Sequence, residues 1–276
     1  MLLKFSEELN DIFTPREKKQ IGKMFLMDYL DFDASDLLLK KDEKVSSEII
    51  ERLNSAIYHI NRGKPVQYVL GSVHFYGLEL KIDKRALIPR PETEELVEWI
   101  IEVWKDKSPR TLDVGTGSGC IPLAVKANIP KSDVYGVDVI QFALDLAIEN
   151  AEKLNLDVTF DFANAMNLKT YSDQKWDLII SNPPYIPIDE KEEMNAHVVD
   201  HEPGTALFVP NDNPLLFYKV IALYAKDYLE ADGSLFFEIH ENLSKEIVTF
   251  LNAYGFSKVE VRKDLQGKDR MVHAQF

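Results

Sequence analysis

The chain has 276 residues, of which 45% are hydrophobic and 28% charged, a composition typical of globular proteins. Its 32 basic and 46 acidic side chains give a formal net charge of −14, and no more than two basic residues are adjacent anywhere. This charge argues against a surface built to grip a nucleic-acid backbone.

The cysteine count and the N-terminal sequence indicate the cell compartment in which the protein is expected. Cys120 is the single cysteine, so an internal disulfide is excluded and no zinc-binding pattern can be assembled around it. The N-terminal residues include acids where a signal peptide would be apolar, and nowhere do 18 apolar residues run together. We therefore expect a soluble, cytoplasmic protein without a membrane partner.

Residues 1–63 are predicted to form a small helical domain. Thr14 to Glu17 form a capping box with proline at the first helical position. A second helix is predicted to begin at Ser46 or Ser47 and to stop near Gly63.

Residues 64–91 are predicted to form a linker that contains a β-hairpin. The segment VHFYGLELKID alternates β-formers around Gly77, and Pro89 and Pro91 then end the strand. A helix is predicted from Glu92 through Trp104, with acidic residues that complement its N-terminal dipole.

From residue 92 to residue 276 we predict one α/β domain. Five apolar runs alternate with helical stretches, which is typical of βαβ units around a parallel sheet: 111–115, 133–138, 157–161, 176–181 and 233–239. The last two candidate strands, 256–262 and 270–276, are separated by a short turn. They are expected to close a seven-stranded, mostly parallel sheet with a C-terminal antiparallel hairpin.

A glycine-rich loop follows the first strand of this domain. Its spacing in Gly115–Gly119 is G-x-G-x-G, which matches neither the P-loop nor the strict dinucleotide fingerprint. Glycines let the backbone turn sharply and approach a ligand at a helix N-terminus. Asp138, about 20 positions later, can accept hydrogen bonds from a ribose. Together they indicate a nucleoside cofactor, whereas a ligand-free turn and a solvated aspartate are the structural alternatives.

The segment Asn182–Tyr185, Asn-Pro-Pro-Tyr, follows the fourth strand. Two consecutive prolines cannot continue a central strand, so they predict a rigid, extended exit with free carbonyls. The Asn182 side chain and the Pro183 main chain both offer carbonyl oxygens. Such a pair of acceptors could hold a planar NH2 group while Tyr185 stacks on its face. The alternative is a proline loop with a capping asparagine.

These motifs resemble the class I S-adenosylmethionine-dependent methyltransferases, whose domain is Rossmann-like. Further segments make the chain similar to the PrmC/HemK-type glutamine-N5 methyltransferases of peptide chain release factors. The matching segments are 65–68, 87–94, 113–119, 181–186, Glu202-Pro203 with Ala206-Leu207, and Asp264-Leu265 with Asp269-Arg270. The resemblance spans roughly residues 65–276, and the helical N-terminus agrees in kind.

The resemblance implies methyl transfer from S-adenosylmethionine to the side-chain amide nitrogen of a glutamine in the GGQ motif of release factors, with S-adenosylhomocysteine as product. It requires no metal, nucleophile or strong base. It places the cofactor's methionine part against Gly115, Thr116, Gly117, Ser118 and Gly119, its ribose at Asp138 and its adenine beside Asn164 and Ala165. Asn182 and Pro183 would bind the substrate amide, Asn182 also reaching the cofactor, and Pro184 and Tyr185 would shape the slot.

Two positions depart from the family pattern. Asn164 stands where the family usually has aspartate, and an asparagine there still accepts and donates hydrogen bonds. His240 follows Glu238-Ile239 where glycine is usual, and the sequence assigns it no role.

Other functions remain open from the residues alone. An adenine-N6 or other nucleic-acid methyltransferase could use the same Asn-Pro-Pro-Tyr segment. Charge argues against it, because residues 81–276 carry twelve of the fourteen net negative charges and the loop 189–202 is acidic. An inactive binding protein and a nicotinamide-dependent oxidoreductase are weaker alternatives. The N-terminal helices would recognise the protein substrate or simply cap the catalytic domain.

Overall fold

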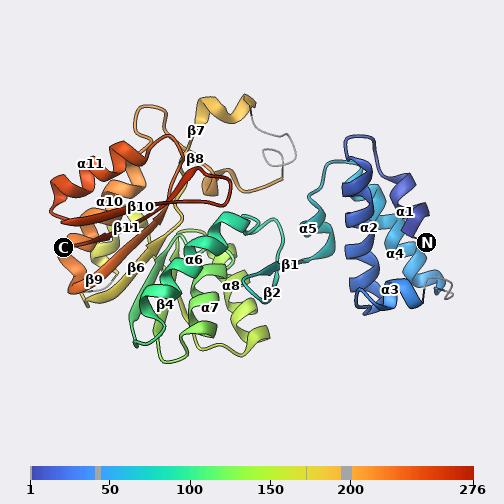
Figure 1. Ribbon diagram of the computed structural model, residues 1–276, viewed down its shortest axis with the longest axis horizontal. Coiled ribbons are helices and arrows are strands. Elements are labelled where there is room, and N and C mark those ends of the chain that lie inside the picture. The colour runs from blue at the N-terminus through green and yellow to red at the C-terminus, as the bar shows by residue number, and fades with distance from the viewer. Residues whose placement is uncertain (1, 41–44, 172, 194–200) are drawn as a thin grey trace. The chain divides into compact units, whose positions relative to one another are not determined.

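The computed structural model describes residues 2–40, 45–171, 173–193 and 201–276, and the chain folds into two compact units. One unit holds the residues up to Ser72, and the other holds almost all of the chain from Val73 onward. The first unit is helical, and the second is a sheet with helices (Figure 1). Across the ranges described, no helix is both long and apolar enough to cross a membrane.

The first unit is built from helices that bury one common core. In the described part of the chain they are α1 (Leu2–Glu8), α2 (Pro15–Leu30), α3 (Asp36–Leu39), α4 (Ser47–Ile60) and α5 (Val66–Leu70). Phe5, Phe25 and Ile60 lie in the core of this unit, and each is at most 2% exposed. Burial of such large apolar side chains stabilises a small helical domain, because each removes its surface from water.

The predicted helix starts are confirmed. The Thr14 hydroxyl accepts a hydrogen bond from the Glu17 N–H, and the Glu17 carboxylate accepts one from the Thr14 N–H at 2.7 Å, which completes the capping box. At the start of α4, the Ser46 hydroxyl accepts from the N–H of Ile49.

The structure differs from the sequence prediction at residues 66–70, which form the short helix α5 inside the predicted linker. The helix buries Tyr68 and ends at Gly71, which adopts a left-handed conformation with φ +85°. Five residues are too few to display a helical period in the sequence, so the pattern carried no signal. The predicted hairpin follows, with β1 (Ser72–Phe75) and β2 (Leu78–Lys81) joined through a tight turn.

The second unit has the predicted α/β architecture. Its first half contains α6 (Pro91–Trp104), β3 (Arg110–Val114), α7 (Cys120–Asn128), β4 (Asp133–Asp138), α8 (Gln141–Leu154), β5 (Thr159–Phe162), the 3₁₀ helix η1 (Ala165–Thr170) and β6 (Trp176–Ser181). Its second half contains β7 (Ile186–Pro187), η2 (Ile188–Glu193), η3 (Gly204–Ala206), β8 (Phe208–Val209), α10 (Leu216–Tyr228), β9 (Leu229–Glu238), α11 (Ser244–Tyr254), β10 (Lys258–Lys263) and β11 (Asp269–Gln275). Residues 194–200 of the acidic segment lie outside the described residues.

The main sheet has the strand order β10-β11-β9-β6-β3-β4-β5. The strands from β9 to β5 pair in parallel, whereas β11 pairs antiparallel with both β9 and β10, so the predicted closing hairpin is confirmed. Successive residues of β6 face opposite sides: Ile179 packs with α10 and α11, and Leu178 and Ile180 pack with α6 and α7. Because both faces are covered by helices (Figure 1), the central strands β3 and β6 are buried over almost their whole length.

Parallel pairing also brings several strand ends to one edge of the sheet. The last residues of β3, β4, β5, β6 and β9 are Val114, Asp138, Phe162, Ser181 and Glu238, respectively. In open parallel sheets this carboxyl edge is where ligands bind, because the connecting loops diverge there. The predicted glycine loop and the Asn-Pro-Pro-Tyr segment both begin at this edge.

Gly136 of β4 tests how tightly this edge is packed. A Cβ atom at position 136 would lie 2.7 Å from both the Phe160 ring and the Thr116 Oγ1. We expect Gly136→Ala to lower the free energy of unfolding by about 1–3 kcal/mol, because the added methyl group overpacks a filled site. Denaturant unfolding measures the change. Gly204→Ala is the control, since its nearest atoms lie 3.7 Å away on Phe208, and equal loss in both variants would contradict the packing argument.

Candidate active site

A cavity opens at the carboxyl edge of the sheet. Residues from loops far apart in the sequence line it, within 85–93, 114–121, 138–143, 163–165 and 181–184, together with Pro203, Ala206, Phe217 and Ile221. It therefore brings together the predicted glycine loop, Asp138, the Asn164–Ala165 step and the Asn-Pro-Pro part of the substrate motif. A single concave site with few polar groups among apolar ones is typical of cofactor binding.

The glycine loop between β3 and α7 is held by hydrogen bonds to β4. The N–H groups of Gly115 and Thr116 donate to the Val137 carbonyl, and the Gly117 N–H donates to Asp138 Oδ2 at 2.9 Å. Gly115 and Gly117 both have positive φ, +79° and +54°, which favours glycine. The loop conformation therefore depends on Asp138 as well as on its own glycines.

Asp138 has a structural task that the sequence did not reveal. Its Oδ1 accepts from the N–H of Ile140 while its Oδ2 holds Gly117, so both oxygens already bind main chain. Burial raises the pKa of this carboxyl, and the main-chain hydrogen bonds oppose the rise. Each carboxylate oxygen has a second lone pair, so the group can still accept from a ligand in the cavity that it lines.

Gly119 serves packing. It is not among the described residues that line the cavity, unlike the loop residues from Gly115 to Ser118. A Cβ atom at position 119 would lie 3.0 Å from the Phe160 ring and 3.1 Å from Ala147 Cβ. The last glycine of the motif therefore allows α7 to begin close to α8 and β5.

Asp113, in β3 just before the glycine loop, is a buried acid to which the sequence assigned no separate role. Its side chain is 0% exposed, and within the described residues neither carboxylate oxygen makes a hydrogen bond. Burial raises its pKa to about 7, and the negative charge of Asp138 adds to the rise. The Thr116 hydroxyl opposes this rise. Asp138 lines the cavity and Asp113 adjoins the glycine loop, so negative charge lies close to the place where a ligand would bind.

The Asn164–Ala165 step follows β5, and both residues line the cavity. Asn164 Oδ1 accepts from the Met166 N–H at 2.9 Å and so caps η1. At this departure from the family pattern, the asparagine keeps the capping function that an aspartate would have.

The Asn-Pro-Pro-Tyr segment leaves β6 at the cavity. Ser181 is anchored by a 2.6 Å hydrogen bond from its hydroxyl to the Val114 carbonyl, and Asn182, Pro183 and Pro184 line the cavity. Asn182 Nδ2 donates to Thr93 Oγ1 at 3.3 Å. Thr93 lies 89 positions before Asn182 and belongs to the first turn of α6, so the motif is tied to the start of that helix.

Tyr185 lies differently from the other three residues of the motif. The described residues that line the cavity do not include it, and its hydroxyl donates to Glu238 Oε1 at 3.4 Å. Its ring packs edge-on against His240, with 5.8 Å between centroids. His240, the second departure from the family pattern, thus contacts the motif directly, and its Nε2 lies 3.8 Å from Glu190 Oε2.

Glu238, at the end of β9, is a second acid that the sequence did not single out. It is 2% exposed and accepts a 2.6 Å hydrogen bond from the Thr93 hydroxyl. Burial raises its pKa to about 7, which the Thr93 hydrogen bond and the positive charge of Arg270 oppose. Only the tertiary structure could reveal this contact, because Thr93 and Glu238 are 145 positions apart.

An ion pair joins two of the segments that carry the family resemblance. Arg90 donates to both carboxylate oxygens of Glu202, at 2.8 and 2.9 Å, and the Glu202 side chain is 2% exposed. The Ile88 N–H also donates to Glu202. Since Arg90 and Pro203 line the cavity, this pair fixes the loop before α6 next to the loop that begins at residue 202.

Comparison with known proteins agrees with this geometry. Residues 105–256 match a methyltransferase domain, and residues 1–71 match the PrmC N-terminal domain. The release factor glutamine methyltransferase of Flavobacterium psychrophilum is 37% identical over 99% of this chain and 96% of its own length. The enzyme of the same name from Bacteroides thetaiotaomicron is 37% identical over 97% and 96% of the two chains. That of Streptococcus pneumoniae is 39% identical over 86% and 85%.

Solved structures agree on the fold. The catalytic domain of human METTL16 in complex with a MAT2A 3′UTR hairpin superposes with a TM-score of 0.59, at 16% identity over 84% of this chain and 81% of that one. The ribosomal protein L11 methylase of Lactobacillus delbrueckii gives 0.51, at 18% identity over 71% and 84%. At such low identity the likeness establishes the methyltransferase fold alone. The domain matches and the full-length relatives together establish that this chain belongs to the release factor glutamine methyltransferase family.

Proposed function

We propose that this protein transfers a methyl group from S-adenosylmethionine to the side-chain amide nitrogen of a glutamine in peptide chain release factors. The observation that carries the proposal is the pair of acceptors at the cavity, the Asn182 side chain and the Pro183 main chain, on the segment that leaves β6. The names of the 37% identical relatives support the same substrate. The partner would be a protein of translation, which places the reaction in the cytoplasm.

The residues around the cavity fit this cofactor. S-adenosylmethionine carries a sulfonium and an ammonium, and Asp138, an acid that lines the cavity, supplies negative charge that would attract them. The loop from Gly115 to Ser118 would hold the methionine part, with Asp138 at the ribose and Asn164 and Ala165 at the adenine. When bound, the cofactor supplies an electrophilic methyl group on a good neutral leaving group, and S-adenosylhomocysteine is left after transfer.

The chain's own task is to prepare the amide. An amide nitrogen is a poor nucleophile, because its lone pair is delocalised into the carbonyl. Two oxygens that accept its N–H hydrogens would favour a pyramidal nitrogen and direct its lone pair at the methyl group. Asn182 Oδ1 and the Pro183 carbonyl supply these acceptors, so catalysis is mainly orientation and electrostatics. The nitrogen would gain the methyl group as the sulfur–carbon bond breaks, and it would then lose one of its protons to water.

The domain division follows from the same proposal. Residues 1–63 would be the substrate-recognition domain, residues 64–91 the linker with its hairpin, and residues 92–276 the catalytic domain. The family model of the N-terminal domain, which covers residues 1–71, supports a separate helical module. The names of its relatives indicate a protein substrate, which favours recognition over a purely structural role.

The substrate class is tested by methyl transfer from radiolabelled S-adenosylmethionine. We expect label in a release factor and none in DNA or ribosomal RNA offered at equal concentration, because the protein carries a net charge of −14. A release factor whose GGQ glutamine is replaced by alanine is the matched control. Label in nucleic acid, or label in the control protein, would contradict the proposed substrate.

Asn182→Ala tests the catalytic assignment. We expect kcat to fall about 100-fold or more, because the variant removes a polar contact to the reacting group. The dissociation constant for S-adenosylmethionine should change little in calorimetry. Asn252→Ala, whose side chain bonds its own helix at Val248, serves as control. Turnover like the wild type in Asn182→Ala would show that the amide binds elsewhere.

Asp138→Ala tests the cofactor assignment. We expect the dissociation constant for S-adenosylmethionine to rise at least about tenfold, since the variant removes a negative charge and the hydrogen bond that holds Gly117. Asp138→Asn should weaken binding less, because its amide oxygen can still accept from one main-chain N–H. Calorimetry measures both constants, and unchanged affinity in Asp138→Ala would mean that the ribose lies elsewhere.

A further inference from the structure

A chain of hydrogen bonds runs from the end of β9 to the substrate motif. The Thr93 hydroxyl donates to Glu238 Oε2 at 2.6 Å, and Asn182 Nδ2 donates to Thr93 Oγ1 at 3.3 Å. Thr93 and Glu238 are each 2% exposed. Thr93 of α6 and Glu238 of β9 are therefore shielded from bulk water, and in such surroundings hydrogen bonds are strong and unpaired polar groups are costly. Asn182, which follows β6, is part-buried and connects this pair to the cavity.

The hydrogen bonds of this chain can point only one way when Glu238 is ionised. A carboxylate only accepts, so the single hydroxyl proton of Thr93 must point to it. The threonine oxygen then has only lone pairs left, and it can only accept from Asn182. An asparagine has a donor end and an acceptor end. With its NH2 group held by Thr93, its Oδ1 is left for the cavity.

The positive charge of Arg270 opposes the effect of burial on the Glu238 carboxyl. Burial raises the pKa of Glu238 to about 7, and Glu92 adds to the rise, whereas the positive charge of Arg270 and the hydroxyls of Thr93 and Tyr185 lower it. Without Arg270, burial alone would favour the neutral acid.

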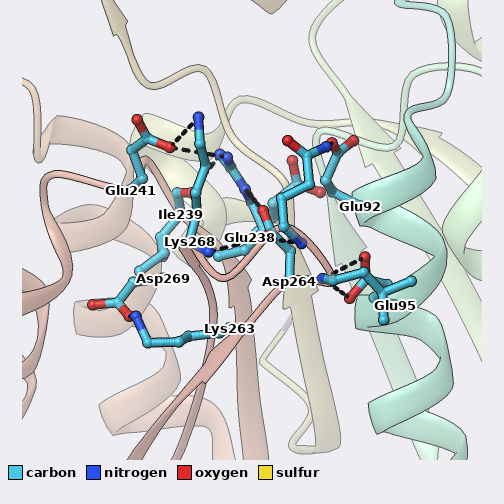
Figure 2. Close-up of polar contacts among 12 residues, drawn as sticks. Glu92, Glu95, Glu238, Ile239, Glu241, Lys263, Asp264, Lys268 and Asp269 are labelled. Atoms are coloured by element: carbon cyan, nitrogen blue, oxygen red, sulfur yellow. Dashed lines mark hydrogen bonds and ion pairs between the residues drawn. The ribbon is translucent and has the colours of Figure 1, made fainter.

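Arg270 is itself fixed by the β10–β11 hairpin, of which Figure 2 labels Lys263, Asp264, Lys268 and Asp269. Its guanidinium lies 3.2 Å from Asp264 Oδ2, donates to the Ile239 carbonyl and lies 3.6 Å from Glu241 Oε2. Asp264 in turn accepts from the N–H groups of two residues of the hairpin turn. The Arg270 guanidinium is thus held in place by several partners.

We propose that Thr93 and Glu238 are positioning residues, which hold the Asn182 amide with its oxygen toward the substrate. The proposal rests on the proposed function in one respect: the substrate group that donates to Asn182 Oδ1 is taken to be an NH2 group. The opposite orientation would present the Asn182 NH2 to the substrate NH2, two donors face to face. The hydrogen-bond direction set at Glu238 therefore selects the only orientation that can bind the substrate.

Thr93→Val and Thr93→Ser form a matched pair for the test. Valine has nearly the same shape as threonine but no hydroxyl, so Asn182 loses its acceptor. We expect kcat on a release factor to fall about tenfold in Thr93→Val, the effect of one lost hydrogen bond. Thr93→Ser should retain most of the wild-type kcat. In both variants the dissociation constant for S-adenosylmethionine should stay within about threefold of the wild-type value. Thr249→Val, on α11, controls for the substitution itself.

A double-mutant cycle separates positioning from a general structural effect. If Thr93 acts through Asn182, Thr93→Val should cost nothing further in an Asn182→Ala background. A glutamine side chain can donate as well as accept, so the single variant Glu238→Gln should likewise lower kcat. Combined with Thr93→Val, it should cause little further loss of kcat. Full additivity, or wild-type kcat in Thr93→Val, would overturn the proposal.

A spectroscopic measurement keeps the proposal testable if release factors are not the substrate. In protein labelled with ¹⁵N-asparagine, the side-chain NH2 signal of Asn182 is the one missing from Asn182→Ala. We expect its hydrogen exchange to be slow in the wild type and in Thr93→Ser, and at least about tenfold faster in Thr93→Val. A wild type inactive on release factors but with this protected signal would contradict the proposed function alone. Equal exchange rates would contradict the positioning of Asn182.

Discussion

Parallel pairing of β3, β4, β5, β6 and β9 brings the ends of five strands to one edge of the sheet, and each part of the candidate site begins there. The pairing is possible because helices cover both faces, so strands can be apolar throughout and still avoid water. Loops that diverge from a common edge leave a cavity between them, and polar residues placed at strand ends face that cavity without disturbing the core.

Negative charge gathers at this edge in a way that serves the proposed chemistry. Asp113, Asp138 and Glu238 are all acidic groups whose pKa values are raised by burial, and Asp138 and Glu238 each have a partner that favours the ionised form. For Asp138 that partner is main chain, and for Glu238 it includes a threonine hydroxyl and a nearby arginine. A cationic cofactor would play the same part for Asp113, and its binding would then be coupled to the protonation state of the site.

Contacts between distant segments hold the substrate side of the cavity. Arg90 pairs with Glu202 over 112 positions, and the Leu265 N–H at the hairpin tip donates to Glu95 of α6 over 170 positions. Figure 2 labels Glu95 near Asp264 of the same hairpin turn. Segments on α6 or just before it therefore contact segments in the second half of the domain through hydrogen bonds and an ion pair. The rigid start of α6 links them, since Thr93 lies in its first turn.

Local patterns in the sequence were enough to predict the helix starts, the α/β class, the closing hairpin and the residues of the glycine loop, because each depends on spacing over a few residues. The helix α5 left no such pattern. The partners of Asn182 could not be predicted either, since Thr93 and Glu238 lie far away in the sequence and look like an ordinary helix residue and a strand end. Only the tertiary structure decided that these two residues meet beside Asn182, because hydrogen-bond direction in a buried site depends on which groups the packed sheet and helices bring within 3 Å or so of each other.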